Sequence, residues 1–217
     1  ARPNMKGYQM SDFTKTHDAD GIATITWDCY ERPMNVMSEQ GFFDLDVMVD
    51  DCLADETVKG VIITSAKSDF AAGMDLSVIA QTKEKNPENP AQGCFEMVTQ
   101  IHKILRKIEL AGMDFKTKKG GKPFVAVLPG TALGIGLEIP LACHHIIAAD
   151  NPKAKIGLPE IKVGIFPGAG GTTRLVRKLG AMGASAILLE GKLNNPSKAK
   201  AAGIIDAVSM TPMDDAK

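Results

Sequence analysis

Short apolar runs separated by segments of helical periodicity restrict the fold of this chain more than any other feature. Residues 21–28 (GIATITWD) show β-branched residues in alternation, which is typical of a strand. Nearly continuous apolar runs follow at 58–65 (VKGVIITS), 123–130 (PFVAVLPG) and 145–150 (HIIAAD). Runs of this kind are typical of strands buried on both faces of a parallel sheet. A last strand is predicted within IIDAVS (204–209).

Helical patterns fill the intervals between these runs. After Ser38, a good N-cap, apolar residues recur at helical spacing up to Leu53. Residues 94–110 are predicted to form an amphipathic helix, and 174–190 and 197–203 two further helices. The apolar face of the amphipathic helix is expected to carry Phe95, Val98, Ile101, Ile104, Leu105 and Ile108. Strands that alternate with helices favour an α/β fold with parallel pairing.

Polar and proline-rich segments between these elements are interpreted as loops. Residues 83–93 read as a polar loop, 111–122 as an exposed, lysine-rich excursion, and 157–175 as a loop-dominated stretch. No compositional boundary divides the chain, and 217 residues fit one domain.

Bulk properties exclude several classes of function. The net charge of −1 argues against nucleic-acid binding and against attraction to anionic membranes. The apolar stretches fall short of the ~18 residues that a membrane span needs, and no secretory signal pattern is present. Four scattered cysteines without metal-ligand spacing predict no metal site, and they indicate reduced thiols in a cytoplasmic protein.

One carboxylate, Glu138, interrupts the apolar run LPGTALGIGLEIPLACHH (128–145). Burying a lone carboxylate is unfavourable unless a partner compensates it. Gly134 and Gly136 allow close backbone approach to a ligand where a strand passes into a helix, and the amides of a first helical turn suit a developing negative charge. Taken alone, Glu138 is better explained as a first-turn glutamate that interacts with its own helix dipole. The match to a GxGxxG motif fails at Ile139, and there is no P-loop.

Three further stretches carry candidate chemistry. Residues 68–75 (SDFAAGMD) form a strand-to-helix turn, GLPE ends at a second acid, Glu160, and 166–175 (FPGAGGTTRL) is rich in glycine. Singly, these are explained as a plain turn, an ordinary proline–acid turn and a flexible connector. Together with the Glu138 turn they supply two amide-bearing turns and two acids. Such a set can activate a water, exchange a proton with carbon and hold an enolate oxygen.

The motifs SDFAAGMDL, GTALGIGLEIPLAC, GLPEIKVGIFPGAGGTTRL and AKAAGIIDAV resemble the enoyl-CoA hydratase (crotonase) family in order and separation, over residues 21–209. The resemblance implies the ClpP/crotonase fold, a spiral of ββα units. PMNVMS and the 22-residue step from Glu138 to Glu160 resemble the hydratase region of the multifunctional fatty-acid-oxidation alpha subunit, which also carries a 3-hydroxyacyl-CoA dehydrogenase.

The resemblance also divides the chain into segments. Residues 21–217 are expected to form a crotonase-like domain that is truncated at the C-terminus. Residues 1–20 are expected to be an N-terminal extension, in which ARPN reads as vector-derived and Met5 or Met10 as the natural start.

The same resemblance assigns the site residues. Glu138 and Glu160 take the places of the two family glutamates, and the backbone N–H groups of Met74 and Ile135 take those of the oxyanion hole. The implied reaction is the reversible hydration of trans-2-enoyl-CoA to 3-hydroxyacyl-CoA in fatty-acid β-oxidation. An apolar surround is expected to raise the pKa of at least one carboxyl group. The residues expected along the substrate and its CoA portion are Ala72, Gly73, Asp75, Leu76 and Gly134.

Two alternatives remain open for the activity. A Δ3-Δ2 enoyl-CoA isomerase needs only one acid, and a silent acyl-CoA-binding or assembly domain needs none. The family more often has glycine at the position of Ile135 and alanine at that of Met74. A β-branched side chain at Ile135 would crowd the thioester oxygen in the silent alternative.

No cofactor is expected for hydration, because coenzyme A is part of the acyl-CoA thioester substrate. NAD would be required only by a dehydrogenase region in a longer chain. The expected assemblies are a homo-oligomer, or packing against a dehydrogenase region and a thiolase subunit.

Overall fold

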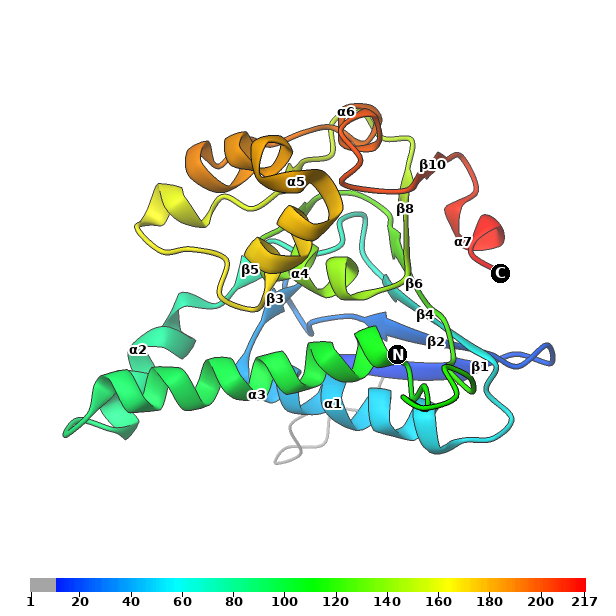
Figure 1. Cartoon of the computed structure of the whole chain (residues 1–217), viewed down its shortest axis with the longest axis horizontal. Coiled ribbons are helices and arrows are strands. Elements are labelled where there is room, and N and C mark those ends of the chain that lie inside the picture. Colours follow the sequence, from blue (N-terminus) through cyan, green and yellow to red (C-terminus); the bar gives the residue numbers. More distant parts are fainter. Residues whose placement is uncertain (1–10) are drawn as a thin grey trace.

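A six-stranded sheet forms the centre of the molecule in the computed structural model, which describes residues 11–217, with the backbone alone at 79, 82, 83 and 85 (Figure 1). The strand order is β1-β2-β4-β6-β8-β10. Every neighbouring pair is parallel except β1 and β2, which are antiparallel. The predicted α/β fold with parallel pairing is therefore confirmed. The strands are β1 (Phe13–His17), β2 (Ile22–Trp27), β4 (Gly60–Ser65), β6 (Phe124–Leu128), β8 (His145–Ala149) and β10 (Ala207–Ser209).

Strand β1 corrects the expectation that residues 1–20 form an extension outside the domain. Phe13 lies opposite Trp27 in the ladder, is buried, and stacks on the indole with ring centroids 5.3 Å apart. The sequence FTKTH hides this strand because its only large apolar residue is the first. The predictions about ARPN, Met5 and Met10 fall outside the described residues.

Two short parallel ladders lie beside the central sheet. One pairs β3 (Val36–Met37) with β5 (Gly73–Met74), and the other pairs β7 (Ala132–Leu133) with β9 (Ile156–Gly157). A bridge between Ala71 and Ala132 joins the two ladders. They bring together the backbone segments that lead into the helices beginning at Leu76 and at Ile135.

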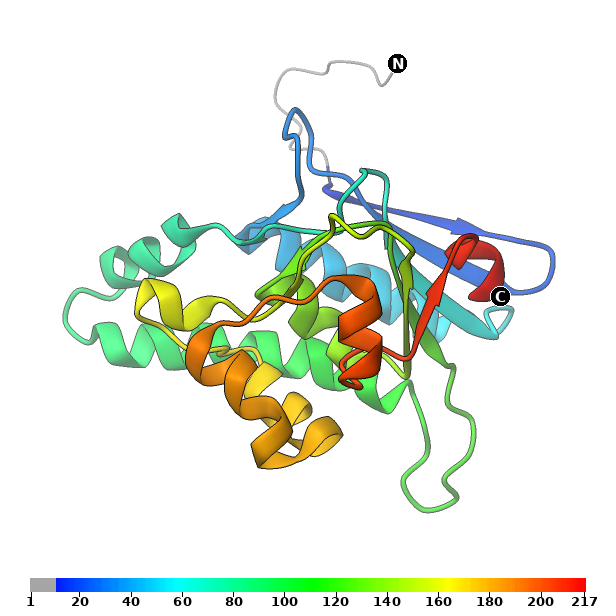
Figure 2. The ribbon, with the colours of Figure 1, turned by 90° about the horizontal axis from the view of Figure 1, so that it is seen from above.

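Helices cover the sheet, and the long α3 runs beside α1 in both views (Figures 1 and 2). Ser38 caps α1 as predicted, because its hydroxyl oxygen accepts a hydrogen bond from Gly41 N at 2.9 Å. The apolar side chains of the helices and of β2, β4 and β6 form one core cluster. The helices are α1 (Glu39–Ala54), α2 (Leu76–Lys85), α3 (Pro90–Leu110), α4 (Ile135–Ala142), the 3₁₀-helix η1 (Glu160–Val163), α5 (Gly171–Glu190), α6 (Pro196–Ala201) and α7 (Pro212–Asp215).

Helix α3 differs from its prediction in two ways. It begins at Pro90, four residues earlier than expected, because Asn89 caps it and proline is favoured at the first helical position. Phe95 is 65% exposed and does not share the buried face of Ile101 and Leu105. Residues six apart on a helix are rotated by about 240°, so Phe95 points away from the face of Ile101.

The segment 111–122 projects from the body between α3 and β6, as predicted (Figure 2). Its last residue, Lys122, donates hydrogen bonds through Nζ to the carbonyl oxygens of Cys52, Leu53 and Asp55. These carbonyls lie at the C-terminal end of α1, where helix carbonyls lack intrahelical partners. The lysine therefore caps the C-terminal end of α1. Among the helices of residues 11–217, none has the length and apolar character needed to cross a bilayer.

Candidate active site

A cavity of about 530 Å³ lies between α3, the start of α4 and the segment 159–169. Its lining comes from parts of the chain that are far apart in sequence, namely 72–76, 94–101, 134–138 and 159–169, with Phe42 from α1. The structure thus gathers both candidate acids and both candidate amide turns around one space. The predicted site residues in its lining are Ala72, Gly73, Met74, Leu76, Gly134, Ile135, Glu138 and Glu160.

Asp75 is the one predicted site residue that does not line the cavity. Its carboxylate caps α2 by accepting a hydrogen bond from Ser77 N at 3.0 Å, and it forms an ion pair with Arg32 at 3.3 Å. The hydrogen bonds from Ser77 are the main cause that lowers the pKa of Asp75. The side chain therefore has a local structural role at the start of α2.

Glu138 lies in the first turn of α4 and is only 3% exposed. Its Oε1 accepts hydrogen bonds from Ala169 N and Gly171 N, both at 2.9 Å. Gly171 is the first residue of α5, so the carboxylate binds at the start of another helix as well as lying in its own first turn. A Cβ at position 171 would lie 2.8 Å from Oε1, so this approach requires glycine.

Burial is the largest influence on the acidity of Glu138 and raises its pKa from 4.5 to about 7. The nearby charge of Glu160 acts in the same direction, whereas the N–H groups of Gly171 and Ala169 oppose the rise. Because the charge of Glu160 influences the pKa of Glu138, the two acids are electrostatically coupled. A carboxyl group with a pKa of about 7 exchanges protons near neutral pH.

The loop that supplies these N–H groups is held in place by side chains of α3 and α5. Arg174 donates from Nη1 to Ala169 O at 3.1 Å and from Nη2 to Glu109 Oε2 at 3.2 Å. His102 Nε2 lies 2.6 Å from Gly168 O. Residues 166–175 are therefore a fixed loop and helix start, which corrects their interpretation, taken singly, as a flexible connector.

Glu160 begins η1 and is half-buried against the first turn of α4. A Cβ at Gly134 would lie 3.3 Å from Glu160 Oε1, so the glycine leaves room for this carboxyl group. Its Oε2 is buried and has no hydrogen-bond partner among the described residues. Burial raises the pKa of Glu160 above its ordinary value. This carboxyl oxygen, unpartnered within the described chain, can exchange a proton with a molecule in the cavity.

The two candidate amides lie on adjacent backbone segments at the cavity wall. Ile135 is the first residue of α4, so its N–H has no carbonyl partner inside the helix. Leu133 N donates to Ala71 O at 3.1 Å, and a Cβ at Gly134 would lie 3.8 Å from Gly73 Cα. The Ile135 side chain is 4% exposed and belongs to the core cluster. The turn of Met74 and that of Ile135 therefore meet at the same place.

One face of α3 supplies an apolar wall of the cavity, and the apolar face predicted from the sequence includes only Val98 and Ile101 of this wall. Its residues at the cavity are Cys94, Met97, Val98 and Ile101. Helical periodicity indicated an apolar face but not that its N-terminal half borders a cavity. In residues 11–217, no group of three or more histidine, cysteine or acidic side chains is arranged to hold a metal ion.

The raised pKa of Glu138 predicts how stability depends on pH. Between about 4.5 and 7 the folded protein binds more protons at this site than the unfolded chain does. The free energy of unfolding should therefore fall as pH rises through this interval, by on the order of 3 kcal/mol, and level off above it. Glu138→Gln should remove this contribution. Urea unfolding of both proteins from pH 5 to 8 measures it, and parallel curves for the two proteins would contradict the prediction.

Comparison with known proteins gives consistent results. Residues 17–214 match the family model described as enoyl-CoA hydratase/isomerase. The alpha subunit of the fatty acid oxidation complex of Shewanella amazonensis is 32% identical over 197 residues, which are 90% of this chain and 26% of that protein. The peroxisomal fatty acid beta-oxidation multifunctional protein MFP2 of Arabidopsis thaliana is 34% identical over 191 residues, or 87% and 24% of the two chains. The chain thus spans about a quarter of the length of these relatives.

Solved structures share the fold. An enoyl-CoA hydratase from Thermoplasma volcanium superposes with a TM-score of 0.80 at 25% identity, covering 95% of this chain and 75% of the other. One from Geobacillus kaustophilus gives a TM-score of 0.79 at 26% identity, covering 96% and 72%. The predicted crotonase-like architecture is therefore confirmed.

Proposed function

The chain belongs to the enoyl-CoA hydratase/isomerase family, and from this premise we propose that it catalyses the reversible hydration of a trans-2-enoyl-CoA to a 3-hydroxyacyl-CoA. The observation that carries the proposal is the convergence of Glu138, Glu160 and two amide-bearing turns on one apolar cavity. The names of the curated relatives support a place in fatty-acid β-oxidation.

In this proposal the thioester oxygen is held by the N–H groups of Met74 and Ile135. Negative charge gathers on this oxygen as water adds at C3, and one such donor is typically worth ~3 kcal/mol in the transition state. The start of α4 adds the positive end of its helix dipole. Ala72, Gly73, Leu76 and Gly134 contact the CoA side of the substrate, and the apolar wall of α3 contacts the acyl chain.

The two acids divide the proton transfers. Two N–H groups hold Oε1 of Glu138, which leaves its second oxygen to orient a water and take its proton. The water oxygen bonds to C3, and Glu160 delivers a proton to C2. Burial raises the pKa of Glu160 above its ordinary value, which favours proton donation, and its Oε2 has no hydrogen-bond partner among the described residues. Each positioned acid or base contributes on the order of 10²–10⁴-fold.

The reaction as proposed uses no cofactor, since coenzyme A enters with the substrate. NAD, a dehydrogenase region and a thiolase subunit belong to the proposal only for a longer chain of the kind that the relatives represent. A homo-oligomer stays a prediction. So does the cytoplasmic location, with which the four free cysteines of the described chain are compatible.

The test is an absorbance assay that follows loss of the conjugated enoyl thioester, with short-chain and long-chain substrates. We expect turnover of crotonyl-CoA that depends linearly on protein concentration. Binding of an acyl-CoA without turnover, in this chain and in a longer natural form, would instead favour the silent binding domain.

A further inference from the structure

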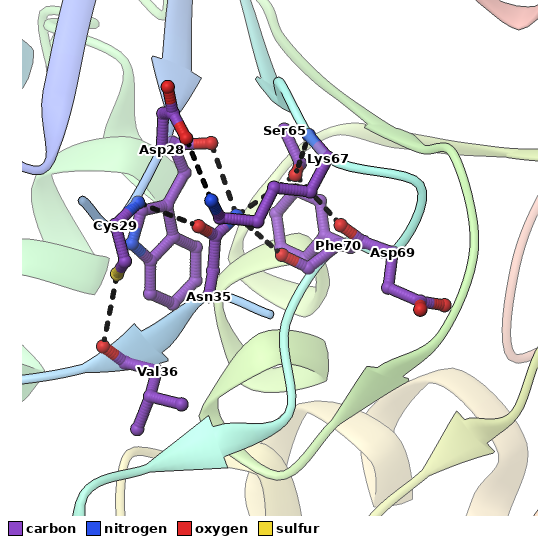
Figure 3. A network of polar contacts seen from close by, with 9 residues as sticks. Asp28, Cys29, Asn35, Val36, Ser65, Lys67, Asp69 and Phe70 are labelled. Carbon is purple, nitrogen blue, oxygen red and sulfur yellow. Dashed lines mark hydrogen bonds and ion pairs between the residues drawn. The ribbon is translucent and has the colours of Figure 1, made fainter. Parts of the chain in front are cut away.

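Asn35 is fully buried beside the C-terminal ends of β2 and β4, and every polar atom of its side chain is hydrogen-bonded (Figure 3). Its Oδ1 accepts a hydrogen bond from Cys29 N at 2.9 Å. Its Nδ2 lies within donating distance of Trp27 O at 3.1 Å, Phe70 O at 3.0 Å and Ser65 Oγ at 2.9 Å. One amide side chain therefore joins the ends of β2 and β4 to the segment that leads into β5.

The backbone of Asn35 continues this link toward Met74. Its carbonyl oxygen accepts from Ala72 N at 2.8 Å, and the next two residues form β3, which pairs with Gly73–Met74. Asp75 N then donates to Met37 O at 2.9 Å. The strand that carries the Met74 N–H is thus attached to a segment whose position Asn35 fixes.

Ser65 and Asp69 extend the same network toward Ile135. Ser65 Oγ donates to Asp69 O at 2.7 Å, and Asp69 Oδ1 accepts from Thr131 N at 2.6 Å. Thr131 O in turn accepts from the N–H groups of Phe70 and Ala71. A Cβ at Gly130 would lie 2.6 Å from Asp69 Oδ1, so glycine is required for this approach. Ile135 begins α4 only four residues after Thr131.

We propose that Asn35, Ser65 and Asp69 form a positioning network that sets the separation of the Met74 and Ile135 N–H groups. The inference rests on the proposed function, because it concerns the oxyanion hole of that reaction. None of the three residues lines the cavity that the described residues form. They therefore influence the site only through the backbone that they position. Donors must lie about 2.7–3.1 Å from the oxyanion, so a small shift of either turn weakens the hole.

A matched pair of substitutions on β4 tests the network. Ser65→Ala removes a hydroxyl group inside it, whereas Thr64→Val removes a buried hydroxyl whose 3.1 Å hydrogen bond goes to Val127 O on β6. We expect both variants to lose similar stability in urea. Ser65→Ala should also lower kcat by about tenfold or more, with KM little changed. The kcat of Thr64→Val should stay within about twofold of the parent value. Only Ser65→Ala disturbs the oxyanion hole, whose donors are worth ~10²–10³-fold each.

Asp69 offers a rescue experiment in the same network. Asp69→Asn keeps an oxygen that accepts from Thr131 N, whereas Asp69→Ala does not. We therefore expect kcat to be largely retained in the first variant and lowered in the second. Equal kcat values for Asp69→Asn and Asp69→Ala would contradict the proposal.

A spectroscopic measurement separates this inference from the proposed function. Hydrogen bonds to a conjugated thioester oxygen polarise it, so bound 2,4-hexadienoyl-CoA should absorb at longer wavelength than the free compound. We expect the shift to shrink in Ser65→Ala and to persist in Thr64→Val. If the parent protein shows the shift but does not hydrate enoyl-CoA, the result would contradict the proposed function but not the positioning role. Equal shifts and equal kcat values in the two variants, or no shift in the parent protein, would overturn the positioning role.

Discussion

Glutamine in place of Glu138 is expected to lower kcat for hydration of crotonyl-CoA by about 10²–10⁴-fold while the protein remains folded. The glutamine Oε1 can still accept hydrogen bonds from Ala169 N and Gly171 N, so the side chain should keep its place. A neutral amide cannot remove a proton from water, and the step that forms the C3–oxygen bond loses its base. Steady-state rates from the enoyl absorbance, with circular dichroism on the same samples, measure both parts of the prediction.

A second glutamine variant provides the control for this measurement. Glu190 is exposed at the C-terminal end of α5, so Glu190→Gln makes the same chemical change away from the cavity. It should hydrate crotonyl-CoA at the parent rate. Hydration by Glu138→Gln at near the parent rate would show that this carboxylate is not the base, and its burial would then have only a structural explanation.

The fold was predictable from sequence where tertiary packing imposes a local pattern. Strands β4, β6 and β8 are buried on both faces, so they are nearly continuous in apolar residues and easy to recognise. Strand β1 is at the edge of the sheet and contributes only Phe13 to the core, so its sequence lacks that pattern. The irregular backbone of 157–170 likewise depends on contacts with α3 and α4 that no local window contains.

The candidate site, like the fold, was predictable from sequence only in part. An acid inside an apolar run is a local anomaly, which drew attention to Glu138, and glycine-rich turns indicated where backbone N–H groups face a ligand. The partners of Glu138 come from residues 31 and 33 positions later, and a sequence pattern cannot assign them. Asp75 was placed at the substrate by resemblance, although Asp before a helical segment is a common N-cap.

Glu160→Gln is expected to lose both hydration and isomerisation, whereas Glu138→Gln should lose hydration alone. Glu160 is the proposed proton donor at C2 in hydration. Isomerisation of a 3-enoyl-CoA requires a proton to leave C2 and a proton to be added at C4, so the ionised Glu160 would take the C2 proton and return it at C4. Hydration of crotonyl-CoA should therefore fall by about 10²–10⁴-fold in both variants. Isomerisation of a 3-enoyl-CoA should be lost only in Glu160→Gln. Feeding 3-hexenoyl-CoA to both variants and following the appearance of the conjugated product measures the difference.

The position of Glu160 explains why a single acid is expected to serve both reactions. Its Oε1 lies beside Gly134, next to the amide of Ile135, and its Oε2 is buried without a partner in the described chain. In the proposed complex, this carboxyl group would lie beside the carbons next to the thioester, whose oxygen the same turn would hold. Isomerisation that survives in Glu160→Gln but is lost in Glu138→Gln would exchange the two assigned roles. Retention of both reactions in Glu160→Gln would remove this residue from the chemistry altogether.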